Sequence, residues 1–96
     1  MATIDSIHFY SKTDIDRYWA LVKLTMEKLL GGNLRLADDL RHEISGCPDQ
    51  EQLLFYHTEP LQVAADLVDK RPSKNEVEAY IRLASSEGWY VGWTSP

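Results

Sequence analysis

The stretch TDIDRYWALVKLTMEKLL, from Thr13 to Leu30, decides the fold class of this chain. Its apolar residues recur every three or four positions, which places them on one face of a helix. These residues are Ile15, Tyr18, Trp19, Val22, Met26 and Leu29. Thr13 suits the position that caps the start, and Gly31-Gly32 suits the stop. The sequence therefore predicts a long amphipathic helix over residues 13–30.

Three further helices are predicted from the same period and from their end signals. Asn33 can cap a helix that ends before Gly46, and Pro60 suits the first position of a short helix that closes near Lys70. The tetrad Ser73-Lys74-Asn75-Glu76 is a capping box that opens the last helix. The apolar residues assigned to the inner faces of these helices are Leu34, Ala37, Leu40, Ile44, Leu61, Ala64, Ala65, Val68, Val77, Tyr80, Ile81 and Ala84.

Two parts of the chain have less decisive patterns. Pro48 could open a helix at its first position, but Leu53-Leu54-Phe55-Tyr56 fits a short strand or a buried last helical turn equally well. The segments Ile4 to Tyr10 and Trp89 to Trp93 alternate in the manner of strands and would pair as a small ribbon. The expected fold is all-α: a single helical domain over residues 1–96, built as a compact bundle of four to five short helices, with this small β-ribbon at its termini.

Length and composition limit the class of protein. A chain of 96 residues with 44% hydrophobic residues can build one packed core, without a second domain for a cofactor. Cys47 is the only cysteine of the sequence, so no internal disulfide can form. Neither a signal-peptide pattern nor an apolar run of about 20 residues is present, so the expected location is the cytoplasm, without membrane contact.

Acidic residues are concentrated in the middle of the chain. The net charge is −5, and the segment from Leu36 to Asp69 holds eight acidic residues against the single base Arg41. Such a segment repels phosphate backbones and attracts basic protein surfaces over a long range. We therefore expect a basic protein as the partner and no nucleic acid as a direct ligand.

No pattern in the sequence predicts catalysis. His57-Thr58-Glu59-Pro60 has the first half of a zinc deaminase signature, but the cysteine pair that would complete it is missing. His42, Cys47 and His57 could in principle meet at a metal ion, although their spacing matches no metal-binding pattern. We expect no enzyme, no cofactor and no metal site, and a small metal-binding or enzymatic domain is the third alternative.

Aromatic residues inside the acidic segment are the clearest sign of a binding site. Phe55 and Tyr56 stand near Glu51 and Glu59, and rings surrounded by carboxylates are typical of an interface anchor with its polar rim. Core packing explains such rings as well, and for Tyr56 the two interpretations have about equal weight. The sequence therefore predicts these four residues as partner-binding residues.

The segment from Cys47 to Tyr56 resembles part of the colicin DNase immunity proteins, which are small, acidic, four-helix cytoplasmic proteins. In that family a turn with proline is followed by an acidic residue, two aliphatic residues and an aromatic pair, and here Phe55 and Tyr56 match the pair. The resemblance implies an inhibitor that binds and blocks a toxic basic nuclease, with Phe55 and Tyr56 as central anchors. The acids that would set its specificity are Asp38, Asp39 and Glu43.

Two kinds of binding function follow from these observations. The leading hypothesis is a small acidic protein-binding module that neutralises or regulates a basic partner, with an immunity-type inhibitor of a toxin nuclease as its most concrete version. The alternative is a homo-oligomeric structural or assembly protein that uses Trp89, Tyr90 and Trp93 as an exposed apolar patch. The sequence leaves open whether the protein is a monomer or a homodimer.

Overall fold

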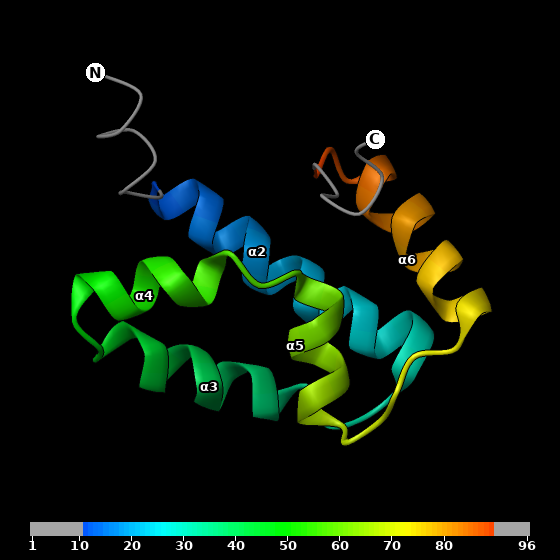
Figure 1. The fold of residues 1–96 in the computed structure, drawn as a ribbon, viewed down its shortest axis with the longest axis horizontal. Helices are drawn as coiled ribbons and strands as arrows, with labels where there is room; N and C mark the ends of the chain where they lie inside the picture. The colour runs from blue at the N-terminus through cyan, green and yellow to red at the C-terminus, as the bar shows by residue number, and fades with distance from the viewer. Residues whose placement is uncertain (1–10, 90–96) are drawn as a thin grey trace.

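The structure, a computed structural model, describes residues 11–89 as a set of short helices (Figure 1). In chain order they are α2 (Lys12–Thr25), its π-helical continuation η1 (Met26–Leu30), α3 (Arg35–Ser45), α4 (Asp49–Tyr56), α5 (Pro60–Leu67) and α6 (Lys74–Ser86). This part of the chain contains no strand, and the predicted all-α bundle of short helices is confirmed. The predicted terminal ribbon lies outside the described residues, apart from Trp89.

Helix α2 is capped by Ser11, which corrects the predicted cap at Thr13. The Ser11 hydroxyl accepts a hydrogen bond from the Asp14 N–H at 3.1 Å, and the Asp14 carboxylate accepts one from the Ser11 N–H at 3.4 Å. Asp16, the acid that could complete a similar box at Thr13, instead accepts a hydrogen bond from Arg41 of α3. That bond holds the pKa of Asp16 below its usual range.

The end of α2 is a wide π-helical turn that closes on glycine. The Gly31 N–H donates to the carbonyl of Met26, five residues back, at 2.5 Å. Gly31 and Gly32 have φ values of +83° and +102°, which glycine adopts without steric cost. A Cβ atom at Gly32 would also collide with the side chain of Val68, just past the end of α5. The predicted stop at this glycine pair is therefore confirmed.

Helices α3 and α4 run antiparallel and are joined by a tight turn (Figure 1). The cap position of α3 is Leu34, one residue after the predicted cap at Asn33, although the Asn33 side chain does accept a hydrogen bond from the Arg35 N–H at 3.0 Å. Pro48 stands at the cap of α4, one place before the first helical position that was predicted. Residues 53–56 form the last turn of α4, so the helical alternative for this segment is the right one.

Helices α5 and α6 begin where the sequence predicts. Pro60 is the first residue of α5, although that helix ends at Leu67 and not near Lys70. At the start of α6 the Ser73 hydroxyl accepts from the Glu76 N–H at 3.1 Å, and the Glu76 carboxylate accepts from the Ser73 N–H at 2.9 Å. The bond from the Ser73 N–H, with a second bond from the Lys70 ammonium, holds the pKa of Glu76 below its usual range.

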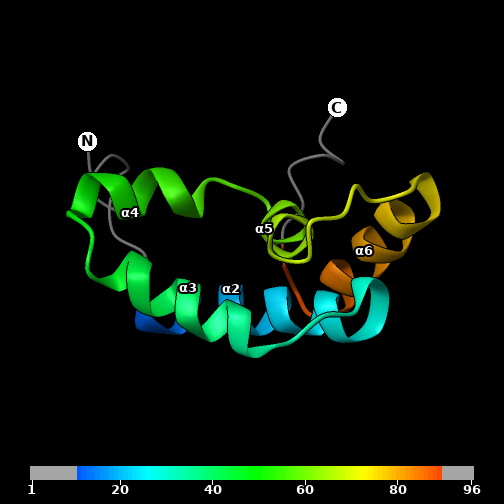
Figure 2. The ribbon, with the colours of Figure 1, turned by 90° about the horizontal axis from the view of Figure 1, so that it is seen from below.

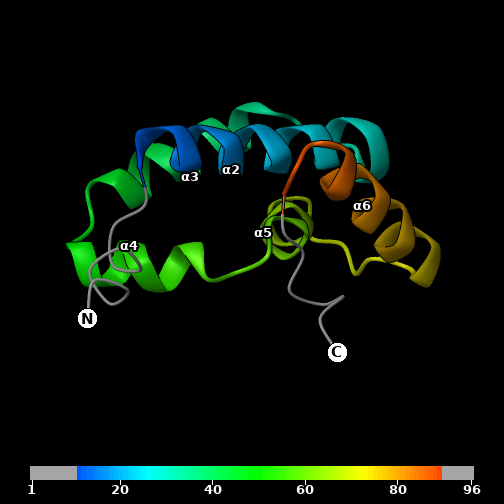
Figure 3. The same cartoon turned by 90° about the horizontal axis from the view of Figure 1, so that it is seen from above.

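Two layers of helices enclose the core (Figures 2 and 3). Helices α2 and α3 lie side by side in one layer, α4 and α5 form the other, and α6 packs against α2 and η1 at one end. The buried residues between the layers are Tyr18, Trp19, Val22, Met26, Ala37, Tyr56, Val63 and Ala64. A second buried cluster joins α2, α5 and α6 and consists of Leu21, Leu61, Tyr80 and Ala84. Helix α2 contributes to both clusters and is the centre of the fold.

Candidate protein-binding surface

Tyr56 lies in the core of the protein. Its side chain is 8% exposed, and its hydroxyl oxygen accepts a hydrogen bond from Trp19 Nε1 at 3.0 Å. The ring of Tyr18 meets the ring of Tyr56 edge-on, with the two centroids 5.0 Å apart. A side chain enclosed in this way is not available as the central anchor of an interface. The structure therefore corrects the predicted role of Tyr56 and favours the core-packing alternative.

Phe55 is half-buried against the same cluster. Its ring is stacked on that of Trp19, with centroids 5.6 Å apart and an angle of 15° between the ring planes. The ring of Tyr18 lies 5.9 Å away on the same cluster. Phe55 therefore holds α4 against α2, and only part of its side chain could reach a partner.

Glu59 joins two helices inside the fold. This half-buried carboxylate precedes α5 and accepts a hydrogen bond from the hydroxyl of Tyr80, on α6, at 2.8 Å. Tyr80 is fully buried, and burial together with the Glu59 carboxylate raises the pKa of its hydroxyl. The structure thus gives Glu59 a role in holding α6 in place, which differs from the rim position predicted for it.

The three predicted acids of α3 have different surroundings. Asp38 forms an ion pair with Lys23 of α2, with 2.6 Å between Asp38 Oδ1 and Lys23 Nζ. Asp39 and Glu43 are exposed. Ala37, which is 1% exposed, marks the core side of α3, and Asp39 lies about 200° further around the helix, on its outer side.

The acids of α3 and those of α4 do not gather on one face. Tyr56 marks the core side of α4, while Glu51 on the same helix is exposed. Because α3 and α4 belong to opposite layers, their outer sides point away from each other (Figure 2). Glu51 therefore lies on the outer side of α4, and Asp39 lies on the opposite side of the molecule.

Leu54 is the residue of this region that the sequence prediction missed. Its side chain is 70% exposed, although it stands between the half-buried Leu53 and Phe55. On a helix, its neighbours one turn away are Gln50, Glu51 and His57. A useful signal was present, because four consecutive apolar residues in a helix cannot all face one side.

The layer that carries Leu54 is acidic and has no base in its sequence. Residues 49–69 contain five carboxylates and neither lysine nor arginine. Glu59 is bound to Tyr80, and the other four acids of this range are exposed. We call the exposed residues Asp49, Glu51, Leu54 and Asp66 the α4/α5 surface; Asp66 lies at its edge, in a shallow depression that Lys70 and Arg71 also line.

Trp89 belongs to the packed part of the structure. It is half-buried, and its ring meets that of Tyr18 edge-on with the centroids 5.8 Å apart. Tyr90 and Trp93, the other two residues of the predicted apolar patch, lie outside the described residues. The half-buried position of Trp89 leaves little of it for contact with a second copy of the chain.

His42, Cys47 and His57, the residues considered as metal ligands, do not come together in the structure. Cys47 lies in the turn after α3, where its thiol donates to the carbonyl of Glu43 at 3.5 Å, while His42 is exposed on α3 and His57 is exposed in the turn after α4. Within residues 11–89, no three His, Cys, Asp or Glu side chains gather as a possible metal site.

No helix within the described range 11–89 has the length and apolar character needed to cross a membrane. In comparisons with protein-family models, curated proteins and solved structures, no match to this chain was found.

Proposed function

We propose that this chain is a protein-binding module whose α4/α5 surface binds a basic partner protein. The observation that carries the proposal is the position of Leu54, a large apolar side chain that is 70% exposed on α4, a helix whose only charged residues are Asp49 and Glu51. An apolar anchor surrounded by polar groups is the usual anatomy of a protein interface.

The energetic part of the proposal rests on Leu54. Burying a leucine side chain that was exposed contributes about 1.5–3 kcal/mol. Truncating it to alanine removes most of that gain, so Leu54→Ala is expected to raise the Kd for the partner by about five- to thirtyfold. The same change should leave folding stability nearly unaltered, because the side chain is on the outer side of α4.

The kinetic part rests on charge. Carboxylates at Asp49, Glu51 and Asp66 would attract a basic surface before contact and speed association. Salt screens such attraction over a distance of about 10 Å at 0.1 M ionic strength. The association rate should therefore fall as salt rises, whereas the contribution of Leu54 to the dissociation rate should persist.

Neutralisation of a toxic basic nuclease is the narrower version of this proposal. The acidic charge of the α4/α5 surface supports it. The two aromatic residues predicted as anchors give weaker support to this version, because Tyr56 is buried and Phe55 is half-buried. Leu54 takes the place of these rings as the exposed apolar group.

The test is a pull-down with the tagged protein from its native extract at low and at high salt, with retained proteins identified by mass spectrometry. The double variant Leu54→Ser/Glu51→Gln should lose a basic protein that the unaltered chain retains at low salt. The matched control is Leu36→Ser/Asp39→Asn on α3, whose leucine is 39% exposed, and it should retain that protein. Equal loss in both variants, or retention in both, would refute the α4/α5 surface as the binding site.

A further inference from the structure

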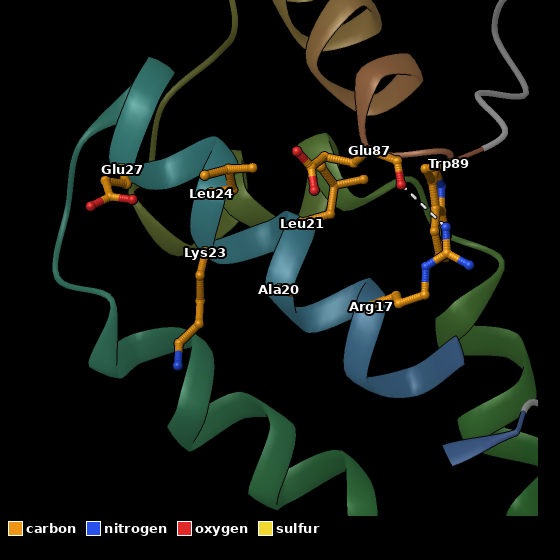
Figure 4. A pocket seen from close by; sticks show the side chains of 8 residues that line it. All are labelled: Arg17, Ala20, Leu21, Lys23, Leu24, Glu27, Glu87 and Trp89. Atoms are coloured by element: carbon orange, nitrogen blue, oxygen red, sulfur yellow. Dashed lines mark hydrogen bonds between the residues drawn. The ribbon is translucent and has the colours of Figure 1, made fainter. Parts of the chain in front are cut away.

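A cleft runs along the side of α2 that faces neither α4 nor the core between the layers (Figure 4). It encloses about 320 Å³, which is at the lower end of the range for small-molecule sites. Helix α2 and η1 supply its length from Arg17 to Glu27, and the end of α6 supplies its other wall through Glu87 and Trp89. None of these residues belongs to the α4/α5 surface.

The floor of the cleft is apolar. Leu21 is 3% exposed and belongs to the core cluster with Tyr80, so the floor is anchored to the packed interior. Ala20 and Leu24 lie beside it one turn apart, and Trp89 closes one end. Ala20 is exposed, and its side chain is a single methyl group.

The two cations at the edge of the cleft are already engaged. The guanidinium of Arg17 donates through Nη2 to the carbonyls of Glu87 and Gly88, both at 3.2 Å. These carbonyls lie at the C-terminal end of α6, where the helix dipole is negative and partly offsets the positive charge. Lys23 is neutralised by its ion pair with Asp38.

The two carboxylates at the edge are not engaged in this way. Glu27 on η1 and the side chain of Glu87 are exposed, and neither forms an ion pair with any residue in the described range 11–89. In Figure 4 the side chain of Glu87 extends from the end of the cleft near Arg17 and Trp89 toward Leu24, and Glu27 lies beyond Leu24 at the other end. The two carboxylates therefore make the part of the cleft around Leu24 negative, whereas the end at Trp89 is aromatic.

We propose that this cleft is a binding site for a small amphiphilic organic cation, of the arylalkylamine class. The aromatic body would lie on Leu21 and Ala20 beside Trp89, where the Arg17 guanidinium can also face its ring. The ammonium group would lie between Glu27 and Glu87. The cleft is about 15 Å long from Arg17 to Glu27, at 1.5 Å per helical residue, so an alkyl spacer is needed between the ring and the charge.

The experiment is a titration of the isotope-labelled chain, followed by two-dimensional NMR, with three probes of similar size. Phenylbutylamine carries the cation, phenylbutanol is neutral, and phenylvalerate carries a carboxylate. We expect saturable shifts at the amides of residues 20–27 and at the indole N–H of Trp89, with the amine bound most tightly and the carboxylate least. Equal affinity for amine and carboxylate, or the absence of saturable shifts at these positions, would overturn the proposal.

Three variants separate this site from general attraction to an acidic protein. One exposed ion pair corresponds to about a two- to fivefold change in affinity, so Glu27→Gln/Glu87→Gln should weaken amine binding by about tenfold. Glu78→Gln, an exposed carboxylate on α6 that does not line the cleft, should leave it unchanged. Ala20→Phe should fill the floor and abolish binding of the amine and the alcohol alike. An equal effect of Glu78→Gln and the double variant, or normal binding to Ala20→Phe, would contradict the assignment.

Discussion

The substitution Tyr56→Phe distinguishes a core residue from an interface anchor. It keeps the ring, and therefore the packing against Tyr18 and Phe55, but it removes the hydroxyl oxygen that accepts from Trp19 Nε1. Trp19 is 2% exposed, so water cannot replace the lost acceptor without a rearrangement. The variant should consequently fold to the same structure with lower stability.

The expected magnitude follows from the burial of that N–H group. A buried donor left without an acceptor costs about 1–3 kcal/mol. A chain of this size has a total stability of about 5–14 kcal/mol, so the loss is a substantial fraction of it. For a domain of about 60–100 residues, each kcal/mol lowers Tm by about 4–8 °C.

Urea denaturation, followed by far-UV circular dichroism, measures this loss as a shift of the midpoint at unchanged slope. Leu54→Ala on the same helix is the control, and its effect should stay within about 0.5 kcal/mol. In a double-mutant cycle with Trp19→Phe, the loss from Tyr56→Phe should shrink, because the donor is already gone. If Tyr56→Phe were as stable as the unaltered chain and yet lost partner binding, the placement of Tyr56 in the core would be refuted.

The remaining predictions concern α6 and the end of α2. Ser73→Ala removes the acceptor of the capping box and should lower the free energy of unfolding by about 1 kcal/mol in the same urea assay, whereas the exposed Ser85→Ala should not. The pKa of the Tyr80 hydroxyl is raised in the folded protein, so the stability that this residue contributes should be complete below about pH 10 and decline above that pH. In Tyr80→Phe the free energy of unfolding should fall less steeply with pH, and an equal slope in the two proteins would contradict this prediction. Gly32→Ala should lower the free energy of unfolding by about 1–3 kcal/mol, because φ is +102° and the new Cβ would collide with Val68. An unchanged Tm would show that the fold does not require a glycine at this position.

The elements that the sequence predicts well are those defined by local chemistry. The spacing of apolar residues in α2, the glycine pair at its end and the capping box of Ser73 each depend on residues within one or two turns. Pro60 at the start of α5 is of the same kind. Such signals act before tertiary contacts form, so a single sequence is enough to find them.

The position of the Ser11 cap could not be predicted in the same way. Two boxes of equal spacing were available, Ser11 with Asp14 and Thr13 with Asp16. In the structure Asp16 is engaged instead by Lys12, four residues before it, and by Arg41, which is 25 residues away in the sequence. The start of the helix is thus partly decided by a contact with α3.

The candidate site depended even more on tertiary structure. Within Leu53-Leu54-Phe55-Tyr56, the direction in which α4 meets α2 decides that Tyr56 points inward and Leu54 outward. The acidic residues fall within one segment of the sequence, yet α3 and α4 lie in different layers, so the acids of α3 are separated from those of α4. Glu59 was expected at a rim because it stands three residues after Tyr56, whereas its actual partner Tyr80 lies 21 residues further along the chain. Local patterns contain no information about these pairings.

The central place of α2 has a consequence for the protein during its synthesis. Every helix described as packing on α2 is encoded after it, and the last of its buried neighbours is Ala84, on α6. At about 5–20 residues per second, roughly 3 to 13 seconds separate the translation of Trp19 from that of Ala84. Throughout that interval the aromatic face of α2 can be covered only by the helices that have already been made. Slow steps late in translation would therefore prolong the exposure of this face to chaperones and to other chains.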